Sequence, residues 1–322
     1  MHLLVVEPAL SEVLADKEKE RQWWAQLEGS ATDLSVEYLT NQTDLRDRIA
    51  GSDAVAGFIS EPALERATDR LQWVHSFAAG PQNQLYPAFL ARNIKLTCSK
   101  GNGAVPLAEH AMLLMLALAR DLPTYLHNQQ DTRWVRHLNI ELTGKTCAIL
   151  GAGNSAKELA TRARAFGMRV IALKRRSESL PEFDQVFGTE QLQAFLKSAD
   201  FLVNTLPLTP HTTNLIGAKE LACLKSTAYY VCVSRGGIVA DDALIAALRN
   251  KQIAGAGLDA HTQEPLPNDS PYWTLANTII SPHDAAHCVG THERGVRILI
   301  ENMKRLHSDQ ELLNIVDTEA GY

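Results

Sequence analysis

One stretch of the sequence, from Lys145 to Arg176, constrains the fold more than any other. It holds a short apolar run, the turn Gly151-Ala152-Gly153-Asn154-Ser155-Ala156, a segment with helical periodicity, and a second apolar run that ends at Leu173. A glycine turn of the form G-x-G-x-x-G/A between the strand and helix of a βαβ unit is the dinucleotide-binding fingerprint. The sequence therefore predicts a Rossmann-type nucleotide site here.

Each position of this turn has a physical role. Gly151 permits the tight turn out of the strand, and Gly153 lets the backbone approach a pyrophosphate. The small Ala156 lets the helix pack closely on the strand, while the backbone at Asn154 and Ser155 presents free N–H groups and the positive end of the helix dipole to phosphate. The alternative is a tight packing turn that binds nothing.

The residues after the second apolar run predict which dinucleotide binds. NAD sites place an acidic residue about twenty residues past the glycines, to bind the ribose 2′-hydroxyl. This chain has Lys174, Arg175 and Arg176 there. Guanidinium groups bind a 2′-phosphate through charge-assisted hydrogen bonds, each worth about 1.5–3 kcal/mol. We therefore expect NADP(H) to be preferred, with NAD(H) possible; the alternative is a solvated basic turn.

Length and composition set the broad class. A chain of 322 residues exceeds what one core usually serves, so we expect two domains. The net charge of −6 argues against nucleic-acid or anionic-membrane partners. The five cysteines form no C-x-x-C pair and predict reduced thiols. The first residues lack a signal-peptide pattern, and the longest apolar run, 111–119, is too short for a bilayer, so we expect a cytoplasmic protein.

Apolar runs along the chain predict two parallel sheets. The first hundred residues alternate expected strands (3–6, 54–59, 73–77 and 95–98) with expected helices (12–28 and 44–50). A long helix is expected over 106–120, and 121–142 is polar and loop-like. With the fingerprint unit, runs at 201–203, 229–233, 254–258 and 278–280 give about six strands, the size of a doubly wound sheet. A terminal helix over 294–306 should return to the first domain.

Four chemically active residues follow the predicted strands of the second sheet. Because ligands bind at the carboxyl ends of parallel strands, Arg235, Asp259 and His283 should face one crevice, with Glu264 on the Asp259 loop. Arg can hold a substrate carboxylate bidentately, and His can supply a proton near neutral pH. Glu264 suits a carboxylate that orients the imidazole, and Asp259 suits the nicotinamide side.

For each residue taken separately, a purely structural role remains the alternative: Arg235 as a partner in a surface ion pair, and His283 as a structural turn residue. His287, four residues past His283, could line the same cleft, whereas His110 reads as an ordinary residue of the linking helix. No His, Cys and Asp cluster has metal-ligand spacing in the sequence, so we predict no metal.

Four sequence blocks together resemble the D-isomer-specific 2-hydroxyacid dehydrogenase family over nearly the whole length. These blocks are the glycine turn with Phe166-Gly167-Met168; Leu206-Pro207-Leu208-Thr209-Pro210-His211-Thr212; Ser234-Arg235-Gly236-Gly237-Ile238-Val239 with Ala243-Leu244; and Gly257-Leu258-Asp259 through Glu264-Pro265-Leu266-Pro267 to Ser281-Pro282-His283. The resemblance implies a two-domain α/β architecture, a doubly wound (Rossmann) parallel sheet plus a smaller flavodoxin-like α/β substrate domain. It places the substrate domain at 1–100 and 291–322 and the dinucleotide domain at 101–290.

The resemblance also implies roles for individual residues. The family's catalytic residues fall on Arg235, Glu264 and His283, and its cofactor-side Asp falls on Asp259. Further cofactor contacts fall on Leu206, Pro207, Thr212, Val233 and Ser234, and the substrate-carboxylate loop falls on Ala78, Ala79 and Gly80. Family members are usually homodimers, and the loop around Trp134 resembles a dimer-side loop from which an aromatic reaches the neighbouring active site.

This chain departs from the family pattern at several positions. Ser155 replaces a large apolar residue, and Lys174 replaces the NAD-selecting acid, which agrees with the NADP(H) prediction. Asp284 follows the predicted catalytic His where an apolar residue is frequent, which could lower affinity for anionic substrates or favour a hydroxyl.

The sequence thus predicts an oxidoreductase that transfers hydride between NADP(H) and a small 2-oxo or D-2-hydroxy acid of the glyoxylate and hydroxypyruvate class. Two alternatives remain: a nucleotide-sensing, corepressor-like binding module on the same fold, and a reductase of a bulkier 2-oxo acid.

Overall fold

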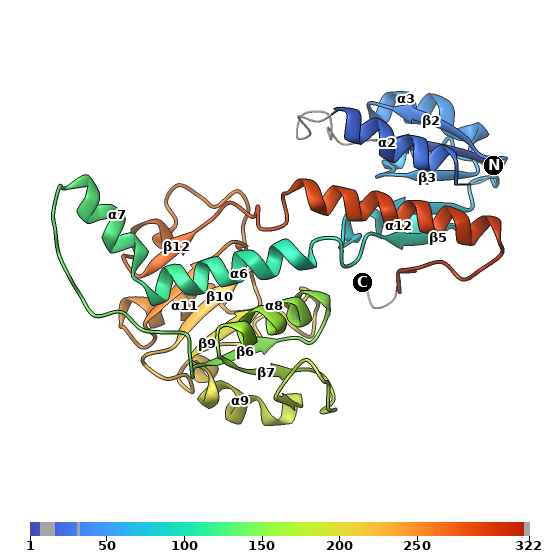
Figure 1. The fold of residues 1–322 in the computed structure, drawn as a ribbon. Coiled ribbons are helices and arrows are strands. Elements are labelled where there is room, and N and C mark those ends of the chain that lie inside the picture. Colours follow the sequence, from blue (N-terminus) through green and yellow to red (C-terminus); the bar gives the residue numbers. More distant parts are fainter. Residues whose placement is uncertain (7–16, 31–32, 319–322) are drawn as a thin grey trace. The chain divides into compact units, whose positions relative to one another are not determined.

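Two units, each built around its own parallel sheet, make up the described chain (Figure 1). The computed structural model describes residues 1–6, 17–30 and 33–318. Unit 1 comprises Met1–Gly103 together with Cys288–Tyr322, and unit 2 comprises Ala104–His287. The sequence-based boundaries, after residue 100 and before residue 291, differ from these by three residues each.

Unit 1 has a five-stranded sheet whose strands are β1 (His2–Val6), β2 (Ser35–Leu39), β3 (Ala54–Ala56), β4 (Trp73–Ser76) and β5 (Lys95–Cys98). Their order is β2-β1-β3-β4-β5 with every pair parallel, which is the flavodoxin-like order. The edge strand β2 was not predicted from the sequence. Its residues, SVEYL, are mostly exposed or half-buried, so they form no apolar run.

The helices of unit 1 include two long ones that share a core. They are α2 (Lys17–Glu28), α3 (Gln42–Arg48), α4 (Glu61–Leu64), α5 (Pro87–Leu90) and α12 (Val289–His307), with short 3-10 turns at Ile49–Gly51 and Gln82–Gln84. The first five residues of the helix predicted over 12–28 lie outside the described residues. On α12, which begins five residues before the predicted start, Val296 and Leu299 pack in one buried cluster with Leu3 of β1 and Trp23 of α2.

Unit 2 has a seven-stranded sheet in the Rossmann order. Its strands are β6 (Thr146–Leu150), β7 (Arg169–Leu173), β8 (Gln185–Phe187), β9 (Phe201–Asn204), β10 (Tyr229–Cys232), β11 (Gly255–Leu258) and β12 (Thr278–Ile280). They lie in the order β8-β7-β6-β9-β10-β11-β12, all parallel, so the strand order reverses between β6 and β9. The predicted fold class is therefore confirmed, with β8 as a seventh, short edge strand.

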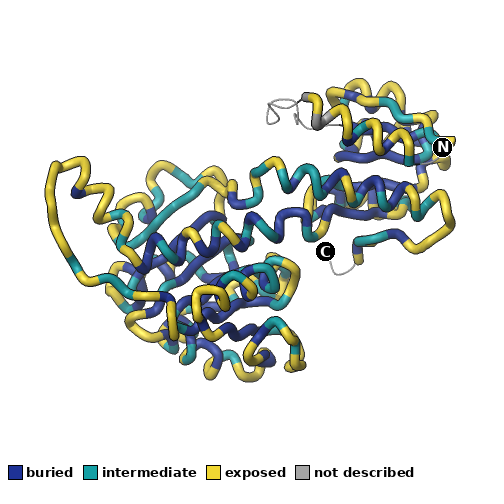
Figure 2. The backbone as a smooth tube through the Cα atoms, viewed as in Figure 1, coloured by how far each residue is buried: buried dark blue, intermediate teal, exposed yellow. Residues whose placement is uncertain are grey.

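Helices cover both faces of this sheet. They are α6 (Ala104–Ala119), α8 (Asn154–Ala165), α9 (Leu192–Ser198), α10 (Ala218–Leu221) and α11 (Asp241–Arg249), with 3-10 turns at Thr189–Gln191 and Pro271–Thr274. A further helix, α7 (Leu122–Gln130), follows α6 and does not lie on the sheet (Figure 1). Successive residues of β6 alternate between two buried clusters: Cys147 packs with α6 and α8, and Ala148 packs with α9 and α11. The central strands β6 and β9 are accordingly buried along their length (Figure 2).

The segment predicted as a loop over 121–142 instead contains the helix α7. Its sequence, LPTYLHNQQ, has a proline in the first turn but few apolar residues, which is why no apolar periodicity indicated a helix. Figure 2 shows α7 and the segment after it largely exposed, with Trp134 at 95% and Leu138 fully accessible. We call residues 122–141 the arm.

Among the described residues, no helix has both the length and the hydropathy to cross a membrane.

Candidate active site

The glycine turn between β6 and α8 has room on its outer side. Gly151 adopts φ +104°, a conformation that favours glycine, and its N–H donates to Leu173 O at 2.9 Å. Gly153 caps α8, and a Cβ placed on it would meet nothing within 4 Å. Packing within the protein therefore does not require glycine at 153, whereas close approach of a ligand does. Ala156, fully buried, packs the helix on the sheet as predicted.

The start of α8 offers hydrogen-bond donors at this open side. Gly153 O accepts from Lys157 N at 3.0 Å, which opens the helical hydrogen-bond ladder. The N–H groups of Asn154, Ser155 and Ala156 therefore have no partner within the helix. Together with the open space beside Gly153, these donors fit a pyrophosphate.

The basic turn after β7 also contains an acidic residue, Glu178, to which no role was assigned from the sequence. Lys174 is half-buried, and Arg175 and Arg176 are exposed. The Nζ atom of Lys174 contacts the carboxylate of Glu178, four residues on. This part of the edge therefore holds three cations and one nearby carboxylate, so it keeps a net positive charge.

Asn204, at the end of β9, joins the turns that follow β9 and β10, and the sequence reasoning missed it. It is fully buried, its Nδ2 donates to Arg235 O at 3.2 Å, and its Oδ1 accepts from Leu206 N at 3.1 Å. Further along, Thr212 Oγ1 donates to Pro207 O at 2.7 Å and so fixes the turn that carries Leu206 and Pro207. The only available signal was an Asn at the end of an apolar run.

Ser234, between the buried Val233 and Arg235, holds an unsatisfied hydroxyl. Its Oγ is buried and has no hydrogen-bond partner within the described part of the chain. A buried polar atom without a partner is costly, so it indicates a group that binds there. Its place at the carboxyl end of β10 agrees with the predicted cofactor contact.

The predicted Arg, Glu and His lie together at the carboxyl edge of the sheet. His283 Nδ1 lies 2.7 Å from Glu264 Oε2, and His283 Nε2 lies 3.5 Å from Arg235 Nη1. Because the carboxylate can only accept, Nδ1 carries the hydrogen toward Glu264 and Nε2 is left on the Arg235 side. Arg235 Nη1 also donates to Ser234 O at 2.7 Å, which holds the guanidinium against its own turn.

Hydrogen bonds keep Glu264 ionised. Partial burial acts to raise the pKa of the Glu264 carboxyl, but the His261 N–H, which donates to Oε1 at 2.9 Å, and the His283 ring outweigh it. The pKa of Glu264 is therefore lowered below its usual value. The ionised Glu264 carboxylate accepts the hydrogen of His283 Nδ1 and so orients the ring.

Gly236 brings the turn that carries Arg235 against the loop that carries Glu264. A Cβ on Gly236 would lie 2.1 Å from His261 C and 2.2 Å from Thr262 N, both backbone atoms. No side chain fits at this position without separating the two loops, so the close approach of Arg235 and Glu264 depends on glycine here.

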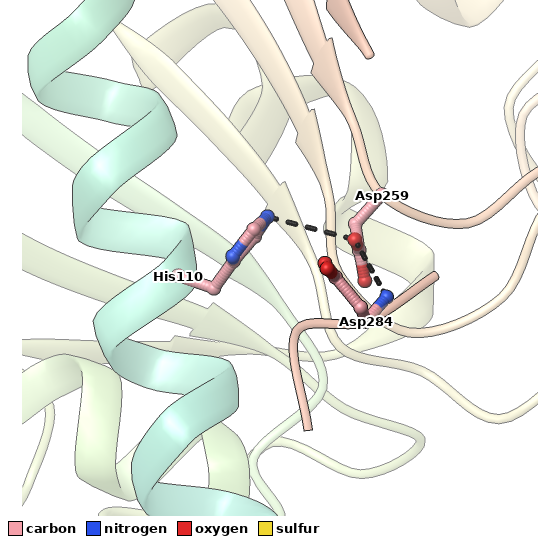
Figure 3. A group of neighbouring side chains, drawn as sticks. All are labelled: His110, Asp259 and Asp284. Atoms are coloured by element: carbon pink, nitrogen blue, oxygen red, sulfur yellow. Dashed lines mark hydrogen bonds and ion pairs between the residues drawn. The ribbon is translucent and has the colours of Figure 1, made fainter. Parts of the chain in front are cut away.

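Asp259 clamps the residues on either side of His283, as Figure 3 shows in part. Its carboxylate is fully buried and accepts from Ser281 Oγ at 2.7 Å, Asp284 N at 3.2 Å and Ala285 N at 3.1 Å. Between these contacts His283 adopts φ +56°, an uncommon value for a non-glycine residue. The clamp therefore holds the backbone conformation that presents the imidazole.

His110 of α6 joins this cluster, although no functional role was predicted for it from the sequence. His110 Nε2 lies 2.9 Å from Ser281 Oγ and 3.5 Å from Asp259 Oδ1 (Figure 3). Ligand atoms of His110, Asp259 and Asp284 all lie within 4.8 Å of one another, close enough to hold a cation. The sequence-spacing argument against a metal could not detect this group, because its members come from three separate segments. Asp259 already uses both oxygens in hydrogen bonds, so we interpret the group as a hydrogen-bonded cluster.

The predicted substrate loop lies in unit 1, directly after β4. Ala78 and Ala79 are exposed and Gly80 is half-buried, and Ala78 N donates to Ser76 Oγ at 3.3 Å. His287 is the last residue of unit 2, where its N–H closes a turn on Asp284 O at 2.8 Å. Trp134 lies on the arm, far along the chain from every other predicted site residue.

Comparison with known proteins identifies the family. Residues 112–285 match the family described as D-isomer specific 2-hydroxyacid dehydrogenase, NAD binding domain. A glyoxylate reductase from Korarchaeum cryptofilum is 30% identical over 285 residues, which cover 85% of each chain. The chain belongs to the D-isomer specific 2-hydroxyacid dehydrogenase family and is an oxidoreductase with a nicotinamide-dinucleotide-binding domain.

Two solved structures resemble the whole chain. A D-isomer specific 2-hydroxyacid dehydrogenase family protein from Aeromonas salmonicida superposes with a TM-score of 0.87 at 29% identity, covering 98% of this chain and 99% of that one. An NADPH-dependent glyoxylate/hydroxypyruvate reductase from Sinorhizobium meliloti, in complex with NADP and sulfate, gives a TM-score of 0.83 at 25% identity, covering 100% and 99%.

Proposed function

We propose that the protein reduces a small 2-oxo acid of the glyoxylate and hydroxypyruvate class to the D-2-hydroxy acid, with NADP(H) as the preferred cofactor. The observation that carries this proposal is the linked set Arg235–His283–Glu264 at the carboxyl edge of a Rossmann sheet. The names of the Korarchaeum and Sinorhizobium relatives support the substrate class.

Arg235 holds the substrate carboxylate, and His283 Nε2 carries the proton that the carbonyl oxygen takes up. The bound reduced nicotinamide supplies the hydride to the carbonyl carbon. Glu264 accepts the hydrogen of Nδ1 and keeps the ring oriented, so that Nε2 is the nitrogen that delivers a proton when negative charge develops on the oxygen. One hydride and one proton convert the carbonyl to a hydroxyl, and His283 is left neutral until it takes up a proton again.

The cofactor contacts follow from the edge of unit 2. The open side of Gly153 and the first turn of α8 suit the pyrophosphate, and the unsatisfied Ser234 Oγ suits a polar group further along the cofactor. Lys174, Arg175 and Arg176 suit the 2′-phosphate, and the Sinorhizobium relative binds NADP. Asp259 contributes by holding the residues on either side of His283, beside the nicotinamide.

Unit 1 is proposed as the substrate-binding domain and unit 2 as the dinucleotide-binding domain. In unit 1 the N–H groups of Ala78, Ala79 and Gly80 lie in an exposed loop at the carboxyl end of β4, where they suit the substrate carboxylate. Turnover with 2-oxo acids of different size decides between a small and a bulkier substrate.

The protein is proposed to act as a homodimer through the arm. Leu126, Trp134 and Leu138 are exposed there by 52, 95 and 101%, which is unusual for large apolar side chains in one segment. The arm also borders a hollow of about 580 Å³ lined by Tyr125 and His137. A second copy covering this surface would bury it, and Trp134 is the candidate to reach the partner's site.

The test is oxidation of NADPH, and separately NADH, with glyoxylate, hydroxypyruvate, pyruvate and a bulky 2-oxo acid. Fast NADPH turnover with a small acid is expected. Faster turnover with the bulky acid would replace the substrate class, and equal use of NADH would remove the cofactor preference. Tight NADPH binding without any turnover would favour the nucleotide-sensing module. Sedimentation of wild type and Leu138→Asp tests the dimer, and a wild-type monomer would refute it.

A further inference from the structure

A short turn in unit 1 supports the loop proposed to bind the substrate carboxylate. The turn, residues 99–102, follows β5 and is closed by Asn102 N donating to Ser99 O at 3.0 Å. Ser99 and Asn102 are both buried. We call these four residues the pedestal, because they contact the loop of residues 76–80 through its carbonyl groups.

Three consecutive carbonyls of the loop point at the pedestal. Ser99 N donates to Ser76 O at 2.9 Å and to Ala78 O at 3.2 Å, and Asn102 Nδ2 donates to Phe77 O at 3.2 Å. In a planar trans peptide, the C=O of one residue and the N–H of the next point in opposite directions. The N–H groups that follow these carbonyls, including that of Ala79, therefore point away from the pedestal. The pedestal thus sets the direction of the loop's donors.

Helix α12 holds the pedestal from the other side. Arg294 Nε donates to Asn102 O at 2.5 Å, which is a short, charge-assisted hydrogen bond. One residue on, a Cβ placed on Gly295 would lie 3.3 Å from Ser99 Oγ and 3.6 Å from Asn102 Nδ2. Glycine inside a helix is unfavourable by about 0.5–1 kcal/mol relative to alanine, and its presence here is consistent with the close packing of α12 on the pedestal.

Arg294 is committed to this contact rather than to an ion pair. Within residues 1–6, 17–30 and 33–318, no carboxylate lies within ion-pair distance of its guanidinium. The acid beside it in sequence, Glu293, accepts from Arg297 Nη2 at 2.6 Å instead. A half-buried arginine whose one hydrogen bond goes to a backbone carbonyl acts by positioning that backbone.

We propose that Arg294 is a positioning residue for substrate binding: through Asn102 it fixes the pedestal, and the pedestal sets the direction of the loop's N–H groups, that of Ala79 among them, which are proposed to bind the substrate carboxylate. This inference rests on the proposed function, because it assumes that the loop binds a 2-oxo acid. Arg294 needs no contact with substrate in this role. Its loss frees the loop to turn its donors away while leaving the residues of unit 2 unchanged.

The experiment compares Arg294→Ala with Arg297→Ala, a matched control one turn further along α12 whose side chain is exposed and pairs only with Glu293. Steady-state kinetics are measured with glyoxylate at saturating NADPH, and NADPH binding is measured by fluorescence. For Arg294→Ala the expected KM for glyoxylate rises about tenfold, the size of one charge-assisted hydrogen bond, with kcat changed less than about twofold. NADPH affinity is expected to stay at the wild-type value, and Arg297→Ala is expected to match wild type throughout.

Arg294→Lys provides a second test that does not depend on the alanine variant folding. A lysine keeps the charge and one donor but lacks the rigid guanidinium, so its KM should fall between those of wild type and Arg294→Ala. A KM equal to wild type in a folded Arg294 variant, even with a lowered melting temperature, would overturn the positioning role. A wild-type enzyme that turns over no 2-oxo acid would instead refute the proposed function.

Discussion

The carboxyl edges of the two sheets have the same architecture but different chemistry. In unit 1 the edge is built from neutral groups: His75 Nδ1 lies 2.8 Å from Thr97 Oγ1, and His75 Nε2 lies 3.2 Å from Ser99 Oγ. In unit 2 the corresponding edge pairs His283 with a carboxylate and a guanidinium. The contacts in unit 1 fix backbone, whereas the groups in unit 2 are those proposed to move a proton.

The two histidines make this difference concrete. His75 is fully buried, and burial lowers its pKa to about 3, so it is neutral at physiological pH. Thr97 Oγ1 also accepts from Trp73 Nε1 at 2.9 Å, and a neutral ring can donate from one nitrogen and accept at the other, so the hydroxyls of Thr97 and Ser99 satisfy both nitrogens of His75. His283 is more than one-third exposed and faces Glu264. A histidine with hydrogen bonds at both nitrogens is thus not by itself a sign of catalysis; the charge of its partners decides.

The largest expected effect comes from removing the proposed proton donor of unit 2. His283→Ala should lower kcat by about 10²–10⁴, the usual span for loss of a general acid. The measurement is NADPH oxidation with glyoxylate at saturating substrate. His75→Gln is the control from the other edge and should retain most of kcat. Similar losses in both variants would mean that the comparison between the edges is wrong.

Gly236→Ala should be the next most damaging. The added methyl group must displace the backbone at His261 and Thr262, which moves Glu264 away from His283 and Arg235. A displacement of about 1 Å at a catalytic group can cost about 10²-fold in rate. Gly153→Ala is the matched comparison, because its methyl group would meet no protein atom. This variant should retain kcat and lower the affinity for the cofactor instead. Wild-type kcat for Gly236→Ala would exclude the proposed dependence on this close approach.

The double change Arg175→Ala with Arg176→Ala should weaken NADPH binding roughly tenfold to a hundredfold and leave NADH binding nearly unchanged. The reason is that only NADPH carries the 2′-phosphate that these side chains are proposed to hold. Titration of each nucleotide by fluorescence checks this. The control Arg249→Ala alters an arginine at the end of α11, in the last turn of that helix. Equal weakening of NADPH and NADH would remove the specificity argument.

The last expected effect is on stability rather than on catalytic rate or cofactor affinity, and it concerns His75 at the neutral edge. The pKa of His75 is depressed in the folded protein, so the unfolded chain binds a proton that the folded chain does not. The contribution of neutral His75 to the free energy of unfolding is therefore fully present above about pH 6.5. It is lost as the pH falls toward 3, at up to about 1.4 kcal/mol per pH unit. Melting temperatures of wild type and His75→Gln between pH 7 and 4 test this. Curves of identical pH dependence would mean that His75 is not the group involved.

Several features could be predicted from the sequence because they depend on neighbours along the chain. The glycine turn at 151–156 needs only a strand before it and a helix after it. Arg235 and His283 could be placed because each follows directly after a strand, and parallel strands all end at one edge. The fold class, confirmed by both sheets, followed from the same alternation of runs.

The remaining features depend on contacts between distant segments, or lack apolar residues. His110, Asp259 and Ser281 come from α6, the end of β11 and the end of β12, and their proximity has no signature in sequence spacing. The edge strands β2 and β8 and the arm helix α7 carry too few apolar residues to form a visible pattern. In the sequence, Gly236 is one residue of a turn. The structure shows that glycine is needed there because the backbone of residues 261 and 262 lies against it.

The division of unit 1 into two sequence segments has a consequence for biosynthesis. Unit 2 is contained entirely within residues 104–287, whereas unit 1 needs Val296 and Leu299 of α12 to cover Leu3 of its first strand. On the ribosome, unit 2 is therefore fully translated while the N-terminal sheet still exposes one apolar face. The segment made first is the one completed last, and this uncovered face is the surface that a chaperone would meet on the nascent chain.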